Sequence, residues 1–380
     1  MKIFIFTSVH PWNDTRIFYK EAISIAKRHE VELHAPAEFD YIEKNGVKIV
    51  GLPKWNKPID RSKIRKIIWD RIKLSDADIF WFHDPELIWI GLKIKLFHKG
   101  KVIYDIHEDY YTQILLKEWI PTKILRRLIA NIYLFIEKFF LQKFDLLLLA
   151  EKYYKNRLSP KLREISIDIL NYPIVESYFN KNEVEKYKSK KKFHKIIYTG
   201  GITQDRGAFN VIEGFKILLT KVDNVKLYFV GKCKDQIIID KIKSDKKLRY
   251  KIVIIGENRF VDRGEIDREY IDADIGLALF PYSLHYNKKL LTKFYEYMIN
   301  KLPIIVSDFN LWKNFIKTNE CGLYVDPTEP HQIADKLLFL INHPEEARKM
   351  GNNGYKAVMG KYKWKNEEAK LFKIKELLSL

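Results

Sequence analysis

Short apolar runs alternate with longer amphipathic stretches along the chain. The runs are rich in β-branched and aromatic residues, and turn residues bound them. In the first half they cover Lys2–Thr7, Glu30–Ala35, Ile79–Phe82, Lys101–Ile106 and Leu146–Ala150. Stretches of helical length separate them, for example Arg16–His29 and Leu87–Phe97. This alternation predicts an α/β fold in which helices cover both faces of a parallel sheet.

The second half of the chain repeats the alternation. Its predicted strands are Lys195–Thr199, Lys226–Val230, Lys251–Ile255, Ile275–Leu279, Pro303–Val306 and Gly322–Val325. Helices are predicted between them, for example Asn210–Thr220 and Pro330–Asn342. Residues 176–194, between the two series, are rich in lysine, which is typical of a solvated linker. We therefore predict two α/β domains, residues 1–175 and 195–361, and a final helical segment, residues 362–380.

The composition narrows the classes of partner. Lysine and arginine outnumber aspartate and glutamate by 68 to 49, so the formal net charge is +19. This charge implies an anionic partner: nucleic acid, a phosphate-bearing ligand or acidic lipid. The two cysteines, Cys233 and Cys321, exclude a disulfide framework and a four-cysteine zinc site. The first residues are typical of a strand and not of a signal segment, which predicts a cytoplasmic protein or one held peripherally at a membrane face.

The segment 117–143 is both basic and apolar. It holds six basic and two acidic residues, a local charge of +4 by subtraction. Its apolar residues are Trp119, Ile120, Leu125, Leu128, Ile129, Ile132, Tyr133, Phe135, Ile136 and Phe139. Charged residues interrupt the most apolar window, Ile132–Ala150, which excludes a membrane span there. Two interpretations stay open: a core helix with a basic outer face, or a helix that lies on an anionic membrane surface.

Polar residues with useful chemistry follow several predicted strands. His10, Asp14 and Arg16 follow the first strand, and His83 and His107 follow the third and fourth. Ligands of open α/β sheets bind outside the carboxyl ends of the strands. We therefore expect these side chains to meet at one rim of the first sheet.

Two Asp-x-Asp pairs are candidates for chelating a divalent ion. They are Asp76 with Asp78 and Asp272 with Asp274. Each pair precedes its strand and so lies at the amino end, away from the expected ligand site. No metal site is therefore assigned.

The turn that begins at Gly200 has the features of a phosphate site. Gly200 and Gly201 let backbone N–H groups approach an anion closely, and the next helix points its positive end there. Arg206 adds a planar pair of donors for phosphate oxygens. A plain tight turn is the alternative interpretation of the paired glycines.

A second candidate site lies at the start of the helix predicted before Pro303. Thr292 and Lys293 open this helix, and Glu296 lies on the same face as Lys293, one turn further on. A helix N-terminus with Lys293 would hold a phosphate, and the Glu296 carboxylate could accept both hydroxyls of a ribose. A surface Lys–Glu pair is the alternative.

The segment Leu291–Asp308 resembles the motif F-E-Y-M-A-x-G-x-P-V-I of family 4 glycosyltransferases. Other family motifs are similar to Asn13–Ile17, Val102–Asp109, Tyr198–Gly207 and Tyr362–Trp364. The matches follow the family's order over nearly the whole chain. The resemblance implies the GT-B fold: two Rossmann-like domains that face each other across a cleft, with a C-terminal helix that crosses back and packs on the N-terminal domain.

The resemblance also implies roles for single residues. Glu296 occupies the position of a glutamate that binds the donor ribose, and Arg206 that of a lysine that grips the diphosphate. Gly201 stands where many members have an arginine, and Lys293 is the expected substitute. Lys288 stands where the family has a further glutamate; Tyr282, His285 and Asn287 are candidates to take over its contacts.

Three sets of site residues are thus expected. The catalytic set is His107, Arg206 and Lys293, in which His107 aligns with a histidine that contacts the transferred sugar. The donor set is Gly200, Gly201, Arg206, Thr292, Lys293 and Glu296. The acceptor set, on the N-terminal domain, is His10, Asp14, Arg16 and His83.

The resemblance implies transfer of a sugar, with retention of anomeric configuration, from a UDP- or GDP-sugar to a glycan or lipid-linked acceptor. Surface polysaccharide or glycoconjugate biosynthesis is the expected setting. The nucleotide-sugar is a substrate, and no cofactor, metal or nucleic acid is expected. Two alternatives remain: a nucleotide-sugar epimerase of the same architecture, and a basic protein that binds nucleic acid.

Overall fold

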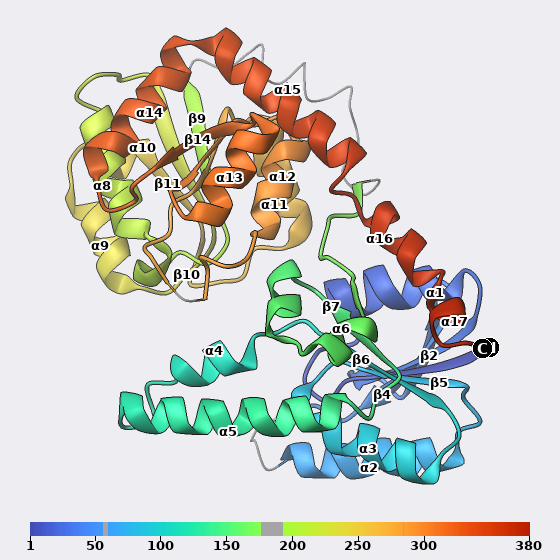
Figure 1. The fold of residues 1–380 in the computed structure, drawn as a ribbon. Coiled ribbons are helices and arrows are strands. Elements are labelled where there is room, and N and C mark those ends of the chain that lie inside the picture. The colour runs from blue at the N-terminus through green and yellow to red at the C-terminus, as the bar shows by residue number, and fades with distance from the viewer. Residues whose placement is uncertain (56–59, 176–192, 284) are drawn as a thin grey trace. The chain divides into compact units, whose positions relative to one another are not determined.

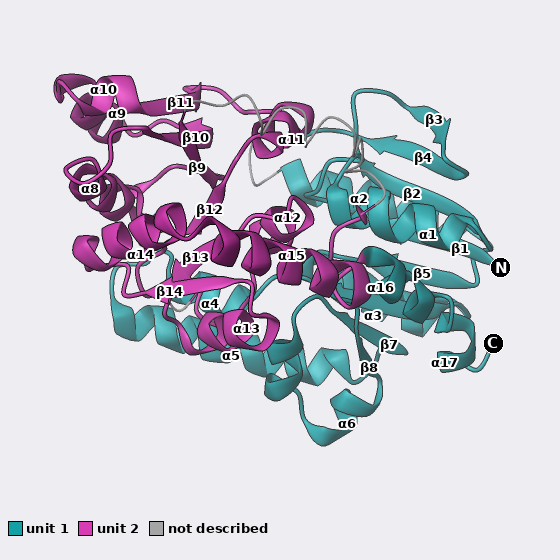
Figure 2. Ribbon diagram, turned by 90° about the horizontal axis from the view of Figure 1, so that it is seen from above, with its two compact units in different colours: residues 1–171, 364–380 teal, residues 172–363 magenta. Residues whose placement is uncertain are grey.

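The computed structural model describes residues 1–55, 60–175, 193–283 and 285–380. They form two compact units (Figure 2). Unit 1 comprises residues 1–171 and 364–380, and unit 2 comprises residues 172–363. The domains predicted from the sequence ended at residues 175 and 361. The predicted linker comprises residues 176–194, of which residues 176–192 lie outside the described residues.

Unit 1 contains an eight-stranded sheet in the order β3-β4-β2-β1-β5-β6-β7-β8 (Figure 1). Its strands are β1 (Lys2–Phe6), β2 (Glu30–Pro36), β3 (Tyr41–Lys44), β4 (Val47–Leu52), β5 (Ile79–Phe82), β6 (Lys101–Ile106), β7 (Leu146–Leu149) and β8 (Ser166–Asp168). All neighbouring pairs are parallel except β3 with β4. These two strands form a hairpin whose turn residues, Asn45 and Gly46, have positive φ values of 53° and 77°, as a tight two-residue turn requires.

The helices of unit 1 fill the connections between its strands. They are η1 (Thr15–Ala22, a π-helix), α1 (Ile23–Ala26), α2 (Asp60–Leu74), η2 (Pro85–Leu87), α3 (Ile88–Phe97), α4 (Tyr110–Leu115), α5 (Lys123–Leu141), η3 (Lys152–Arg157), α6 (Pro160–Glu164), α16 (Trp364–Leu371) and α17 (Ile374–Leu377). The C-terminal helices belong to this unit because Trp364 Nε1 donates to Ser24 Oγ over 2.9 Å and Glu367 accepts from the Leu170 N–H over 2.9 Å.

Unit 2 contains a six-stranded, fully parallel sheet in the order β11-β10-β9-β12-β13-β14. Its strands are β9 (His194–Thr199), β10 (Val225–Cys233), β11 (Ile252–Glu257), β12 (Ile275–Ala278), β13 (Ile304–Ser307) and β14 (Gly322–Val325). Its helices are η5 (Gln204–Arg206), α8 (Ala208–Leu218), α9 (Gln236–Ser244), α10 (Leu248–Lys251), α11 (Arg263–Ile271), α12 (Thr292–Ile299), α13 (Asn310–Asn319), α14 (Pro330–Asn342) and α15 (Pro344–Gly360). The predicted fold class, two α/β domains with parallel sheets, is confirmed.

The strand order identifies where a ligand site should lie in each unit. In a doubly wound sheet, ligands bind at the carboxyl ends of the two strands between which the winding direction reverses. That point lies between β1 and β5 in unit 1 and between β9 and β12 in unit 2.

Among the described residues, no helix has the length and apolar character that a membrane span requires.

The Asp-x-Asp pairs lie at the opposite, amino ends of the sheets, and each pair makes the same kind of contacts in its own unit. Asp78 accepts from the Lys2 N–H and Asp274 from the Lys195 N–H, each over 2.8 Å. The first aspartate of each pair binds the side chain of the same lysine. These contacts support the structural interpretation of both pairs.

Candidate functional site

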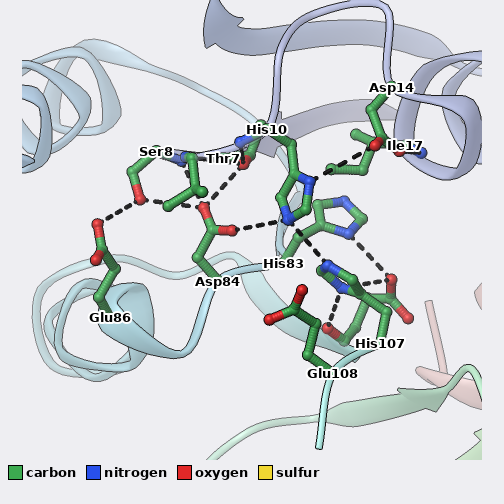
Figure 3. Close-up of polar contacts among 12 residues, drawn as sticks. Thr7, Ser8, His10, Asp14, Ile17, His83, Asp84, Glu86, His107 and Glu108 are labelled. Carbon is green, nitrogen blue, oxygen red and sulfur yellow. Dashed lines mark hydrogen bonds and ion pairs between the residues drawn. The ribbon is translucent and has the colours of Figure 1, made fainter. Parts of the chain in front are cut away.

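Asp84 holds together the loops at the reversal point of unit 1 (Figure 3). It follows β5 and is almost completely buried. Its Oδ2 accepts from Thr7 Oγ1 over 2.8 Å, from the Ser8 N–H over 2.6 Å and from Ser8 Oγ over 3.1 Å. These bonds tie the end of β5 to the loop that follows β1. The loop that carries His10 is therefore held in place by a buried carboxylate.

His10 and His107 meet at this point. Their Nε2 atoms lie 3.0 Å apart, so that one ring donates to the other. His10 Nδ1 lies 3.5 Å from Asp14 Oδ2, and its Nε2 lies 3.5 Å from Asp84 Oδ1. Burial opposes the charged form of His10, but these two carboxylates outweigh it and raise the His10 pKa. Asp14 also caps η1, because its Oδ1 accepts from the Arg16 and Ile17 N–H groups.

A buried ion pair between Arg16 and Asp105 lies next to the two histidines. Arg16 donates from Nε and from an Nη to the two oxygens of Asp105, each over 2.7 Å, and its other Nη donates to the Ile169 carbonyl over 2.9 Å. Only 5% of Arg16 is exposed. The acceptor role expected for Arg16 is therefore corrected, since its guanidinium is engaged inside unit 1. The same carboxylate lies 3.5 Å from His107 Nδ1.

His83 lies deeper than the sequence suggested. Its Nδ1 is 3.0 Å from Asp105 Oδ2 and its Nε2 is 3.7 Å from Glu21 Oε2. Burial lowers the pKa of His83 and raises that of Glu21 well above its usual range, to which the nearby Asp105 charge contributes. Since His83 is completely enclosed, its expected acceptor contact is also corrected. His10 and Asp14, with about a quarter of each side chain exposed, are the accessible members of the expected acceptor set.

Among the described residues of unit 1, two groups have the atoms for a metal site. They are His10 with His107 and Glu108, and His83 with Asp105 and His107, and the ligand atoms in each lie within 4.8 Å of one another. The second group is unsuitable for a cation because Arg16 already neutralises Asp105. The first could bind a divalent ion through the two Nε2 atoms and the exposed Glu108 carboxylate.

Lys293 lies at the reversal point of unit 2. It is the second residue of α12, and its Nζ donates to the carbonyl of Thr199, the last residue of β9. The Nζ also lies over the Tyr198 ring, 4.3 Å from the centroid. Burial, followed by the charge of Arg206, lowers the Lys293 pKa to about 7. The β9 end therefore carries a buried amine that titrates near neutral pH.

The glycine turn brings Arg206 to the same place. An added Cβ at Gly201 would lie 3.0 Å from an Arg206 Nη, and one at Gly200 would lie 3.5 Å from Lys293 Nζ. Gly200 has φ +100°, which favours glycine. Arg206 Nε donates to Tyr286 Oη over 3.2 Å. The two cations thus flank a stretch of backbone that has no side chains of its own.

Glu296 completes this cluster. Its Oε2 accepts from the buried Tyr270 hydroxyl over 2.7 Å, and the Tyr270 oxygen lies 3.0 Å from Thr199 Oγ1. Arg263 pairs with its Oε1. Thr292 opens α12, and within the described residues no side chain caps this helix start. The structure thus brings the predicted donor residues of unit 2 together around the end of β9.

The candidates to replace the family glutamate at Lys288 differ in their surroundings. Lys288 and Tyr282 are exposed. His285 Nε2 lies 2.9 Å from Lys289 Nζ. Asn287 Oδ1 is buried without a hydrogen-bond partner among the described residues, which leaves it able to accept from a ligand.

Sequence analysis missed the residues that hold these clusters. They are Glu21, Asp84 and Asp105 in unit 1, and Arg263, Tyr270 and Tyr286 in unit 2. One signal was available for Asp105, because it is the only charged residue inside the otherwise apolar run Val102–Ile106.

Comparison with known proteins finds a similarity to sugar transferases in about half of the chain. Residues 179–357 match the family model described as "Glycosyl transferases group 1". A capsular polysaccharide biosynthesis glycosyltransferase of Staphylococcus aureus, CapM, is 25% identical over 191 residues. That alignment covers 48% of each protein, so the chain spans about half the length of this curated relative.

Solved structures match over the whole chain at low identity. Sucrose-phosphate synthase from Thermosynechococcus elongatus aligns with a TM-score of 0.76 and 14% identity, covering 100% of this chain and 99% of that one. Anabaena Alr3699/HepE, solved in complex with UDP, aligns with a TM-score of 0.72 and 11% identity over 100% of both chains. At this identity the likeness concerns the fold.

Proposed function

Because residues 179–357 match the group 1 glycosyltransferases, we propose that this chain transfers a sugar from a UDP- or GDP-sugar to a glycan or lipid-linked acceptor, with retention of anomeric configuration. The observation that carries the proposal is the cluster of Arg206, Lys293 and Glu296 around the end of β9. The relative CapM acts in capsular polysaccharide biosynthesis, which favours a similar setting for this chain.

Each part of the cluster matches one part of a nucleotide-sugar. The Glu296 carboxylate accepts hydrogen bonds from the two ribose hydroxyls. These replace the contacts that Tyr270 and Arg263 make with it in the free protein. Arg206, Lys293 and the N-terminus of α12 bind the diphosphate. Gly200 and Gly201 let the diphosphate approach the backbone.

Charge stabilisation explains how such a site accelerates transfer. When the sugar–phosphate bond breaks, negative charge accumulates on the diphosphate. A well-placed donor typically lowers such a barrier by about 3–4 kcal/mol. Because Arg206, Lys293 and a helix N-terminus supply positive charge, we propose that the reaction needs no metal at the diphosphate.

A panel of UDP- and GDP-sugars tests this function. One nucleotide series should raise the melting temperature of the protein, with no turnover until an acceptor is added, and EDTA should not change this result. A product whose anomeric configuration matches the donor, read by NMR, supports retention. An epimerised nucleotide-sugar would identify an epimerase instead, and no response to any nucleotide would refute the donor site.

Binding of a nucleoside diphosphate should take up a proton at Lys293. Its pKa is about 7 in the free protein because of burial and the Arg206 charge, and a bound diphosphate raises it. Above pH 7 the free amine is mostly neutral, so the affinity should fall as the pH rises, approaching about tenfold per pH unit. Calorimetry in buffers of different ionisation enthalpy measures the uptake. The variant Lys293→Met should lose it, and equal uptake in the variant would contradict the assignment.

His107 should act in the transfer step and not in nucleotide binding. It belongs to unit 1, whereas the proposed nucleotide contacts belong to unit 2. We expect His107→Ala to lower turnover about 100-fold while the dissociation constant of the nucleotide changes less than about twofold. The exposed His331→Ala is the control. The reverse pattern, with weaker nucleotide binding and normal turnover, would overturn this role.

A further inference from the structure

The helix α5 carries a row of exposed, large apolar side chains. The row, here called the apolar stripe, consists of Ile124, Leu128, Ile132, Phe135 and Phe139. Its members are 51% exposed or more, and Ile124 and Phe135 reach 83% and 75%. Their spacing of three or four residues places them on one face of the helix. Apolar residues that are scattered singly over a surface need no explanation, but a continuous row indicates an interaction site.

The stripe is not the face by which α5 packs in unit 1. Ala130 and Leu141 are the buried residues of α5, and Ala130 belongs to a small cluster with Ile114 and Ile120 near α4. Figure 1 shows α4 lying along α5. Of the two interpretations of this segment, a core helix with a basic outer face is therefore wrong, because the outer face is largely apolar.

Positive charge surrounds the stripe. Lys123 and Arg127 on α5 and Lys143 just after it are exposed, and Lys138 is partly exposed. The one acidic residue of the helix, Glu137, is drawn inward and accepts from Tyr133 Oη over 2.6 Å. Burial raises its pKa to about 6. The outer surface of α5 thus presents apolar and basic side chains, and the one carboxylate of this helix is bound to Tyr133.

We propose that α5 docks unit 1 on an anionic membrane surface. The apolar stripe enters the boundary between head groups and acyl chains, while the basic residues bind lipid phosphates. This docking deepens the proposed function, because a lipid-linked acceptor lies in such a surface, but the docking itself does not depend on the reaction. A second copy of the chain fits less well, since a twofold contact through α5 would bring the same cations together.

Sedimentation with vesicles tests the docking. The full chain, without nucleotide, should bind vesicles of phosphatidylcholine with phosphatidylglycerol and not vesicles of phosphatidylcholine alone, and high salt should weaken the binding. The variant Phe135→Ser/Phe139→Ser should lower the partition coefficient by at least about tenfold. The control Ile237→Ser/Tyr250→Ser removes side chains that are 64% and 67% exposed in unit 2 and should bind like the unchanged chain.

Each result decides the matter. Failure of the full chain to bind anionic vesicles, or equal loss in both double variants, would overturn the docking. A concentration-dependent dimer that Phe135→Ser/Phe139→Ser dissolves would identify a second copy as the occupant instead. Glu296→Gln should bind vesicles normally, so that failure of the donor site and failure of the docking give different results.

Discussion

Replacing Glu296 with alanine is expected to lower the affinity for the nucleoside diphosphate by about 100-fold or more. The proposed site gives each ribose hydroxyl one charged acceptor, and hydrogen bonds to charged groups contribute about 1.5–3 kcal/mol each. Two such bonds together exceed a factor of about 100, since about 1.4 kcal/mol corresponds to tenfold. Glutamine keeps one acceptor, so Glu296→Gln should fall between alanine and the unchanged chain. Calorimetric titration with UDP and GDP measures both.

The control for this prediction is a carboxylate of the same unit that lies elsewhere. Glu269 pairs with Lys195 at the amino end of the sheet, so Glu269→Ala should leave nucleotide affinity unchanged. Circular dichroism must show that Glu296→Ala remains folded, because the buried Tyr270 hydroxyl loses its acceptor. An affinity within about threefold of normal in a folded Glu296→Ala variant would place the ribose elsewhere.

The fold could be predicted because most strands are buried on both faces. A strand such as β7, Leu146–Leu149, has all four side chains buried and stands out as an apolar run. The hairpin of β3 and β4 was not predicted, because β3 lies at the sheet edge and exposes Tyr41, Glu43 and Lys44. Its sequence is therefore polar, and only the turn Asn45-Gly46 marks it.

The donor cluster was within reach of the sequence because its parts are local. Lys293 and Glu296 share one turn of α12, so their spacing alone places them on one face. Tyr270, which binds Glu296, comes from a separate helix, and no spacing in the sequence predicts that contact. Polar partners from distant elements are set by tertiary packing, which periodicity does not record.

The buried face of η1 is a second feature that the sequence pattern does not predict. Arg16, Lys20 and Glu21 are typical of a solvated helix face, yet all three are buried. Arg16 folds inward because Asp105 and the carbonyl of Ile169 provide partners from two other segments. Lys20 binds the side chain of Asn171, and Glu21 pairs with Arg16. A charge pattern predicts exposure only where no buried partner of opposite charge exists.

Replacing Asp105 with asparagine is accordingly expected to destabilise unit 1 by about 3–5 kcal/mol, because it leaves the buried Arg16 charge without its main partner. The Asp105 carboxylate is fully enclosed, and the Arg16 guanidinium holds its pKa well below the usual range. Urea unfolding followed by tryptophan fluorescence reports on this unit, since Trp312 is the single tryptophan of unit 2 and the other seven of the chain's eight belong to unit 1.

A second variant separates the lost charge from lost packing. In Arg16→Met/Asp105→Leu both charges disappear and apolar side chains take their place, so most of the stability should return. Turnover should stay low in this variant, because His107 Nδ1 has lost the carboxylate that lies 3.5 Å away. If the free energy of unfolding of Asp105→Asn lies within about 1 kcal/mol of that of the unchanged chain, the ion pair does not stabilise this edge of the sheet. If the double variant is no more stable than Asp105→Asn, the loss of stability comes from altered packing and not from the isolated charge of Arg16.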